Sequence, residues 1–137
     1  MTTFSLKIVT PDGIQFDGQA EELVVRTTSG DTGIMAGHIS YVAPLGMGQA
    51  TVVVDGQKRY AACIGGMVSV VNGNVTLVPT TFEWADQIDV ERALSSKNRA
   101  EGVLADKTSS DTDIVLAKAR LKRALVRTSV AGDRKYY

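Results

Sequence analysis

The stretch Q-I-D-V-E-R-A-L-S-S-K-N-R, residues Gln87–Arg99, marks the point at which the pattern of this 137-residue chain changes. From Val90 onward, apolar residues recur at the three- and four-residue spacing of an α-helix. Asp89 stands just before this run, where a helix N-cap belongs. The stretch therefore predicts a helix over residues 89–106.

Everything before this helix has the pattern of β-structure. Short alternating segments, beginning with F-S-L-K-I-V-T at residues 4–10, are separated by turn signals at intervals of roughly 8–12 residues. Two of these signals, Asp55-Gly56 and Asn72-Gly73, are dipeptides typical of β-hairpins. The pattern predicts an all-β sandwich or barrel with about eight to ten strands.

A second helix is predicted after residues 107–113, K-T-S-S-D-T-D, which interrupt the periodicity. Ser110 and Asp113 resemble a capping box, with Asp in place of the usual Glu. The apolar stripe of this helix consists of Ile114, Ala117, Leu121, Ala124 and Thr128. We expect Gly132 and the polar tail that runs to Tyr137 to end it.

The short link between the two predicted helices favours an antiparallel hairpin. The stripes are rich in alanine, so the hairpin buries little apolar area and we expect it to be held weakly. The predicted organisation is a β-sandwich domain over residues 1–85, followed by a two-helix domain over residues 86–137.

Charge divides the chain at the same place, although the formal net charge is zero. Residues 1–85 carry four basic and seven acidic residues, whereas residues 86–137 carry eleven basic and eight acidic residues. The helical part is therefore the basic one and is suited to an anion or an acidic surface. The overall balance argues against a dedicated nucleic-acid-binding protein.

Three further features of the sequence indicate the cellular compartment in which the protein works. The single cysteine, Cys63, cannot form an internal disulfide, which favours a reducing environment. The N-terminal residues M-T-T-F-S-L-K-I-V-T show neither a secretory nor a transit pattern. No apolar run reaches the roughly 18 residues needed to cross a bilayer. We expect a bacterial or plastid-encoded protein that reaches a membrane only through other proteins.

Catalytic chemistry has few candidate residues. The only histidine, His38, has no nucleophile elbow near it, and a turn histidine bonded to local backbone is the simpler interpretation. Cys63 lies in an apolar segment and is interpreted as a small core residue. Gly65-Gly66 is interpreted as a bend or bulge rather than a phosphate-binding loop. We therefore expect a protein that is not itself an enzyme.

The arginines of the helical part form the most informative cluster. Arg120, Arg123 and Arg127 share one helix face, and counting from the turn brings Arg92 to the level of the last two. Converging guanidinium groups suit a polyphosphate, and Asp89 could accept hydrogen bonds from a ribose. Two other interpretations are a solvated basic face paired with Glu91 or Glu83, and a basic helix that binds an acidic protein surface.

Several segments together resemble the epsilon subunit of the F-type ATP synthase. They are V-T-P-D-G at Val9–Gly13, G-D-T-G-I-M-A-G-H at Gly30–His38, Ala43-Pro44-Leu45, I-G-G-M-V-S-V at Ile64–Val70, and the helical hairpin that follows. The resemblance implies a ten-stranded β-sandwich followed by a C-terminal two-helix domain. It also implies a non-catalytic subunit of the central rotor stalk, whose extended helices block ATP hydrolysis and whose folded helices permit it.

Some bacterial members of that family bind ATP on the folded hairpin, and I-D-V-E-R-A at Ile88–Ala93 matches their motif. By this resemblance Ile88, Asp89 and Ala93 hold the adenosine part of ATP. Arg92, Arg123 and Arg127 face its phosphates. Glu83 is the remaining residue that the likeness assigns to the site. The implied ligand is regulatory ATP, with or without Mg²⁺, and no catalytic cofactor is expected.

The resemblance also implies partners and a location. The partners are the gamma subunit, the ring of c subunits, and the alpha and beta subunits of the catalytic head, without nucleic acid. The implied location is the cytoplasmic face of the bacterial plasma membrane, with membrane contact only through the complex. The alternative is a β-sandwich adaptor whose basic helix binds an acidic protein or nucleic acid without a small ligand.

Overall fold

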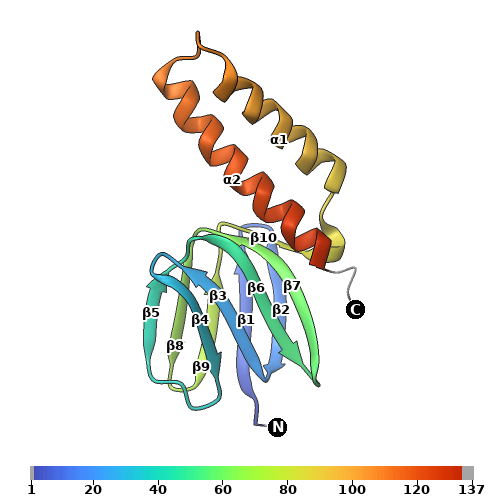
Figure 1. Cartoon of the computed structure of the whole chain (residues 1–137). Coiled ribbons are helices and arrows are strands. Elements are labelled where there is room, and N and C mark those ends of the chain that lie inside the picture. The colour runs from blue at the N-terminus through green and yellow to red at the C-terminus, as the bar shows by residue number, and fades with distance from the viewer. Residues whose placement is uncertain (1, 134–137) are drawn as a thin grey trace. The chain divides into compact units, whose positions relative to one another are not determined.

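Hydrogen-bonded strands account for most of the first 84 residues of the chain (Figure 1). The structure is a computed structural model that describes residues 2–133. Within these residues it contains ten strands followed by two α-helices. The predicted fold class, a β-sandwich followed by a C-terminal helical hairpin, is confirmed.

One sheet has the strand order β2-β1-β9-β8-β5. Its strands are β1 (Phe4–Thr10), β2 (Gly13–Ala20), β5 (Tyr41–Pro44), β8 (Met67–Val71) and β9 (Asn74–Val78). β1 and β9 pair in parallel, with Leu6 opposite Val75, and the other neighbours pair antiparallel. The parallel pair joins the first strand of the sandwich to its second-last one.

The other sheet is antiparallel throughout, in the order β10-β7-β6-β3-β4. Its strands are β3 (Glu22–Thr27), β4 (Gly30–Met35), β6 (Met47–Val54), β7 (Gln57–Ile64) and β10 (Thr81–Trp84). The inward side chains of both sheets alternate with outward ones, as the two-residue period of a strand requires. Leu6, Ile8, Leu23, Val25 and Leu77 are fully buried in the resulting core.

Two hairpins turn where the sequence predicts. Asp55 and Gly56 have φ of 50° and 74°, and Asn72 and Gly73 have φ of 50° and 79°. Two successive positive φ angles define the type I′ turn that matches the twist of paired strands. The first turn is also held from outside, because the buried carboxylate of Glu21 accepts a hydrogen bond from Gly56 N–H at 2.7 Å.

The glycine pair before β8 is a bend, as predicted, and its second residue admits no side chain. Gly65 and Gly66 have φ of 68° and 93°. A Cβ atom on Gly66 would lie 2.0 Å from the carbonyl oxygen of Val78. The strand entry thus depends on close backbone contact that only glycine allows.

An aromatic cluster holds the last residue of the sandwich. The Trp84 ring contacts Phe82 edge-to-face at a centroid distance of 4.9 Å, and Phe16 at 6.5 Å. The guanidinium carbon of Arg59 lies 3.7 Å from the centroid of the Trp84 ring.

The chain divides into two compact units after Trp84, whereas the sequence analysis set the boundary after residue 85.

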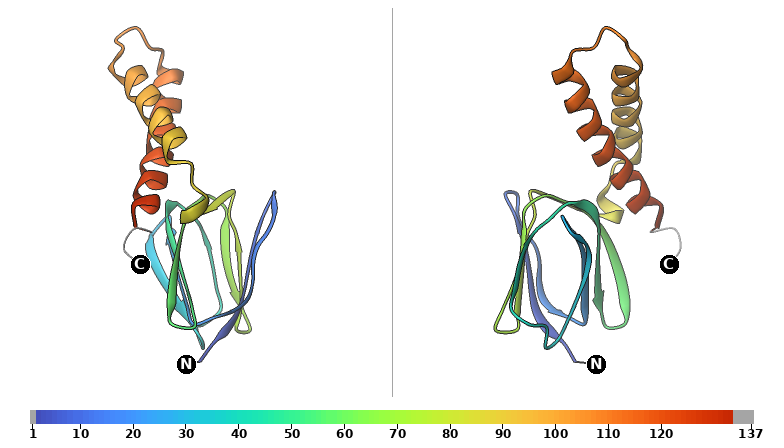
Figure 2. Two further views of the ribbon diagram at one scale, coloured as in Figure 1. Left: turned by 90° about the vertical axis from the view of Figure 1, so that its right-hand side faces the viewer. Right: turned by 60° about the vertical axis from the view of Figure 1, so that its left-hand side comes forward.

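The second unit contains a short 3₁₀ helix, η1 (Ala85–Gln87), and the helices α1 (Val90–Ala105) and α2 (Asp111–Asp133). Figures 1 and 2 show α1 and α2 side by side and running in opposite directions. The hairpin is thus confirmed, although α2 continues through Gly132, where its end was predicted. In the described part of the chain, neither helix is long and apolar enough to cross a membrane.

The turn of the hairpin is built from side chains that bond to backbone. Asp106 Oδ1 accepts hydrogen bonds from the N–H and hydroxyl of Thr108, and these bonds lower the pKa of the Asp106 carboxyl. The Ser109 hydroxyl donates to the carbonyl of Val103 at 2.8 Å. Ser110 Oγ accepts from Asp113 N–H at 3.1 Å, which is one half of the predicted capping box.

Candidate functional site

Asp89 caps α1 as predicted. Its Oδ1 accepts a hydrogen bond from the backbone N–H of Arg92 at 3.0 Å, and its carbonyl accepts from Ala93 N–H at the same distance. The side chain is exposed, so its second oxygen remains accessible to a ligand. Ile88, the residue before the cap, is buried, with 5% of its surface exposed.

The two helices meet along a seam of alanines. The buried residues of α1 are Ala93 and Ala100, which lie two helical turns apart. On α2, Ala117, Ala124 and Ala131 are buried at the same seven-residue spacing. We call these five residues the alanine seam; four of them lie where α1 and α2 face each other, whereas Ala131 lies level with η1, before the start of α1. Their small side chains let the helix axes approach closely, but each buries little apolar area.

The seam and the turn set the register of the hairpin. Counted from the turn, Arg92 lies about 20 Å along α1, and Arg123 and Arg127 lie about 18 and 24 Å along α2, at 1.5 Å per residue. Because α1 and α2 run in opposite directions from the turn (Figure 1), this count puts the three residues at about the same distance from it.

The side of the hairpin on which each arginine lies follows from its position relative to the seam. Arg92 comes one residue before Ala93, and Arg123 comes one residue before Ala124. In two antiparallel helices that face each other, positions just before the seam fall on the same side of the pair. Arg127, three residues after Ala124, falls on that side too.

Exposure differs among these three arginines. Arg92 and Arg123 are exposed, whereas Arg127 is half-buried and its Nε is buried. Among the described side chains, neither Arg92 nor Arg123 forms an ion pair with Glu91, which the sequence analysis named beside Glu83 as a partner for a solvated basic face. The ion pair of α1 instead joins Lys97 to Glu101 at 3.8 Å.

The remaining two predicted site residues have other surroundings. Glu83 lies on β10, opposite Ala62 of β7, and belongs to the sandwich unit rather than to the hairpin unit. Ala93 is fully buried in the seam. Its small side chain therefore sets the distance between the two helices. That distance would affect the fit of any ligand that contacts both of them.

Two arginines that the sequence analysis did not assign to the site share this side of the hairpin. Arg99 comes one residue before Ala100, and Arg120 comes three residues after Ala117. Arg99 is identified by the step of an arginine followed by a seam alanine, which becomes apparent only once the buried alanines are known, whereas the helical spacing already placed Arg120 on one face with Arg123 and Arg127.

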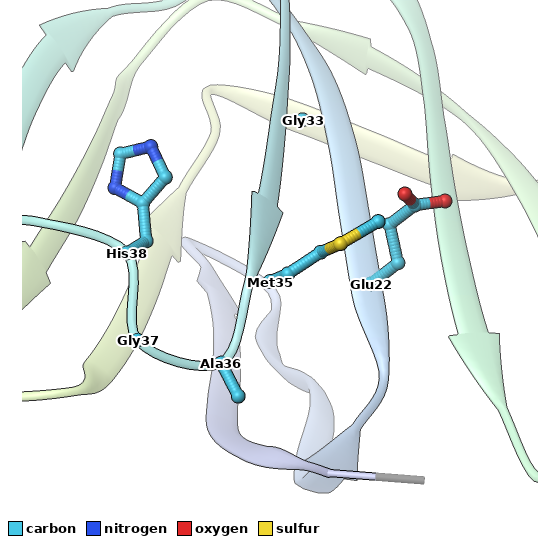
Figure 3. Close-up of a pocket in the computed structure, with 6 residues that line it drawn as sticks. All are labelled: Glu22, Gly33, Met35, Ala36, Gly37 and His38. Carbon is cyan, nitrogen blue, oxygen red and sulfur yellow. The ribbon is translucent and has the colours of Figure 1, made fainter.

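A shallow depression of about 290 Å³ on the sandwich is lined by Glu22, Gly33, Met35, Ala36, Gly37 and His38. Figure 3 shows that the side chains of Glu22 and His38 lie on opposite sides of β4 and do not converge. The Nδ1 atom of His38 lies 2.8 Å from the carbonyl oxygen of Ile39, which confirms the interpretation of a turn histidine with local bonds.

Cys63, the single cysteine of the chain, does not face the surface. Cys63 is 3% exposed in the core, and burial raises the pKa of its thiol to about 12, so the thiol is neutral at physiological pH. Among the described residues, no three His, Cys, Asp or Glu side chains are grouped to hold a metal ion.

The family models match both parts of the chain. Residues 3–85 match the β-sandwich domain of the ATP synthase delta/epsilon chain, and residues 86–132 match its long α-helix domain. The two matches follow one another in the chain without a gap.

Curated relatives cover nearly the whole chain. It is 47% identical to the ATP synthase epsilon chain of Bacillus velezensis over 133 residues, which are 97% of this chain and 100% of the relative. It is 44% identical to the ATP synthase epsilon chain of Ruminococcus albus, covering 98% of this chain and all of the relative.

Solved structures share the fold at lower identity. A chain in the Euglena gracilis mitochondrial ATP synthase (OSCP/F1/c-ring) matches with a TM-score of 0.82 at 18% identity, over 100% of this chain and 83% of that one. A chain in the central stalk/c-ring structure of the Tetrahymena thermophila enzyme matches with a TM-score of 0.65 at 14% identity, over 93% and 95%. These structures show the same fold, and the family models and the bacterial relatives show that the chain belongs to the epsilon-subunit family of the F-type ATP synthase.

Proposed function

We propose that this subunit regulates ATP hydrolysis through a nucleotide-dependent hairpin. In the folded form, Arg92, Arg123 and Arg127 bind the phosphates of ATP, and Asp89 accepts hydrogen bonds from its ribose. The observation that carries this proposal is the position of Arg92 and Arg123, each one residue before a seam alanine and therefore on one side of the hairpin. Forked guanidinium donors match phosphate oxygens.

Weak packing of the seam would make the folded form responsive to the ligand. Each alanine of the seam contributes only a methyl group to the contact, and the larger apolar residues of the two helices, such as Leu104, Ile114 and Leu121, are only half-buried. A ligand that contacts both arms binds only when they are paired, and it therefore shifts the population toward the folded form. The unpaired, extended helices are the form that we propose to block hydrolysis in the catalytic head.

The outer face of the β2-β1-β9-β8-β5 sheet supports a role in assembly. Val42, Met67 and Val78 are 62%, 43% and 47% exposed on neighbouring strands. Met35 and Ile39, at and after the end of β4, are 57% and 77% exposed. We propose that these apolar surfaces contact the gamma subunit and the ring of c subunits, because exposed apolar patches of this kind mark interaction sites.

This assignment places a non-catalytic rotor subunit on the cytoplasmic face of the plasma membrane, held there by the complex. Its sandwich transmits rotation and its hairpin contacts the alpha and beta subunits when extended. ATP acts as a regulatory ligand, with Mg²⁺ as its usual companion ion.

Calorimetric titration of the isolated chain with ATP tests the nucleotide site. Replacing Arg92 or Arg123 with alanine is expected to weaken binding by about 1.5–3 kcal/mol each, the range for hydrogen bonds to charged groups. Lys118→Ala, on the same helix as Arg123 but one residue after a seam alanine, is the matched control. ATP affinity that is the same in all three variants and wild type would exclude the site.

A test of the regulatory role requires the assembled ATP synthase. Removing the residues from Ile88 onward is expected to raise ATP hydrolysis while leaving assembly intact. If the truncated and complete subunits support equal hydrolysis over a range of ATP concentrations, the hairpin is not a brake.

A further inference from the structure

Two β-hairpins of the sandwich turn on an Asx-Gly pair, and their backbones are alike. Asp55-Gly56 joins β6 to β7, and Asn72-Gly73 joins β8 to β9. Asp55 and Asn72 share a φ of 50°, and the glycine that follows each also has a positive φ. All four residues are exposed. Differences in chemical behaviour between the two turns must therefore come from their surroundings.

The surroundings of the two glycine nitrogens differ. The Gly56 N–H donates a hydrogen bond of 2.7 Å to the buried carboxylate of Glu21. In the part of the chain that the structure describes, neither the Gly73 N–H nor the Asn72 side chain has a hydrogen-bond partner. Apart from its neighbours in the chain, no atom lies within 4 Å of the place where a Cβ on Gly73 would stand. The nitrogen of Gly73 is therefore open to reaction.

An asparagine followed by glycine has an intramolecular reaction available to it. The backbone nitrogen of the glycine attacks Cγ of the asparagine, a new N–C bond closes a five-membered succinimide ring, and the side-chain nitrogen leaves as ammonia with the proton of the attacking N–H. Water then opens the ring at one of its two carbonyls, which yields aspartate or isoaspartate. The sum consumes water and releases ammonia, with no oxidant or reductant. Glycine favours the attack because it has no Cβ to obstruct it.

The type I′ turn lies one peptide rotation away from the geometry of ring closure. Turns of types I′ and II′ differ in the orientation of the central peptide group, and the first central residue of type II′ has a ψ of about −120°. At this ψ the nitrogen of the next residue eclipses Cβ, as a five-membered ring requires. The rotation leaves the ladder pair of Val71 and Asn74 in place. In the other turn, the same rotation breaks the bond between Gly56 and Glu21.

We propose that Asn72 is a site of deamidation in the folded protein, with the backbone nitrogen of Gly73 as the nucleophile. We also propose that Glu21 protects the Asp55-Gly56 turn from the corresponding ring closure. The modification needs no enzyme, so its product accumulates with the age of the chain. The sandwich thereby gains a carboxylate at the tip of one hairpin.

The isoaspartate product alters the hairpin more than the charge does. It lengthens the main chain by one carbon in a loop of only two residues, whose type I′ geometry matches the twist of the paired strands. Val70 and Val75 form the second pair from the tip, and both are buried in the core. The β8-β9 hairpin is therefore expected to loosen from its tip, next to the core.

Peptide mapping by tandem mass spectrometry tests the proposal on the full chain after incubation in a mildly alkaline native buffer. Each asparagine is followed by the mass gain that accompanies replacement of –NH2 by –OH. Asn74 in β9 and Asn98 in α1 are internal controls, because valine and arginine follow them. Asn72 is expected to react while both controls stay intact. An Asn72 as intact as Asn74 and Asn98 in the folded chain overturns the site, as does reaction only in urea-unfolded chain.

The role of Glu21 is tested by giving the chain a second Asn-Gly turn. In Asp55→Asn, the introduced side chain is expected to react about tenfold or more slowly than Asn72, because ring closure there first breaks a hydrogen bond to a charged group. Glu21→Ala in the same background removes the acceptor and should bring the two rates together. Glu21→Gln retains an acceptor and should keep part of the difference. Equal rates at the two turns with Glu21 present overturn the protective role.

Urea denaturation followed by Trp84 fluorescence measures the effect of the product and shows that each variant is folded. Asn72→Gly is the unreactive control, because Gly-Gly also supports a type I′ turn. Aged wild-type chain is expected to unfold at lower urea concentration than fresh chain, whereas ageing leaves the midpoint of Asn72→Gly unchanged. Equal shifts in both chains would show that ageing acts elsewhere and would contradict the loosened hairpin.

Discussion

Asp89 accepts a hydrogen bond from the backbone N–H of Arg92 at 3.0 Å, so a residue of the proposed ribose site also starts the helix that carries the proposed phosphate site. Folding of α1 and the position of the Arg92 side chain are thereby linked. A change at Asp89 affects both, and the two effects can be separated by the choice of substitution.

Asp89→Ala removes the cap, and Asp89→Asn retains it. We expect the alanine variant to lose about 1 kcal/mol of helix stability, and the asparagine variant to lose much less, because Asn is as good an N-cap as Asp. Urea denaturation followed at 222 nm measures this difference. Equal destabilisation by the two substitutions would show that the carboxylate acts through its charge rather than as a cap.

Gly66→Ala is expected to prevent the sandwich from folding. The Cβ atom would overlap the carbonyl of Val78 at 2.0 Å, in addition to the strain of a positive φ. Gly73→Ala is the control, because its φ is also positive but no atom lies within 4 Å of the new methyl group. It should cost only about 1–2 kcal/mol. Fluorescence of Trp84, the one tryptophan of the chain, reports the unfolding of both variants.

Ala93→Leu places a large side chain in the alanine seam. Overpacking of a close interface costs about 1–3 kcal/mol, so the hairpin should open before the sandwich unfolds. Helix content at 222 nm should then be lost at lower urea concentration than the Trp84 signal. Ala105→Leu, at an exposed position of the same helix, should leave the two transitions as they are in wild type.

Arg59→Met tests the contact between the guanidinium group and the Trp84 ring. Methionine keeps most of the side-chain volume but removes the charge, so we expect a loss of about 0.5–1 kcal/mol. Lys58→Met, at the neighbouring exposed position of β7, removes the same charge without facing Trp84 and should be neutral. A red shift of Trp84 emission in Arg59→Met alone would give independent support.

Alkaline pH should destabilise the sandwich through Cys63. Burial raises the pKa of its thiol from 9.0 to about 12, so the unfolded chain loses its thiol proton at lower pH than the folded chain does. The stabilising contribution is complete below pH 9 and is lost as pH rises toward 12. The fall in urea midpoint between pH 8 and pH 10.5 should therefore be smaller in Cys63→Ala than in wild type. Parallel curves for the two proteins would contradict this.

Local features were predictable because local physics decides them. The positive φ angles at Asp55-Gly56 and Asn72-Gly73 follow from the residues themselves, and so do the caps at Asp89 and Ser110. Hydrophobic period distinguished the strands from the helices. The predicted limits of α1, residues 89–106, include its cap residues, whereas the helix itself runs from Val90 to Ala105.

Features that depend on distant parts of the chain were not predictable in the same way. The parallel pairing of β1 with β9, and the contact of Arg59 with Trp84, join residues whose proximity no short window encodes. Leu94 is one of the apolar residues that recur at helical spacing after Val90, which suggests a buried position, yet its side chain is 43% exposed. The alanine seam is narrow, so only the residues on its centre line are covered. Arg99 was overlooked for the same reason, since its side of the hairpin is defined by which alanines are buried.

The small side chains of the alanine seam have a consequence for regulation under the proposed function. When packing alone contributes little to closing a hairpin, the concentration of the bound molecule decides how often the hairpin is closed, according to RT ln(1 + [L]/Kd). A hairpin whose helices packed through a wider apolar interface, with the helix axes further apart, would stay closed at any nucleotide concentration and would not respond to the nucleotide. The alanines of the seam thus determine the range of nucleotide concentrations over which the hairpin opens and closes.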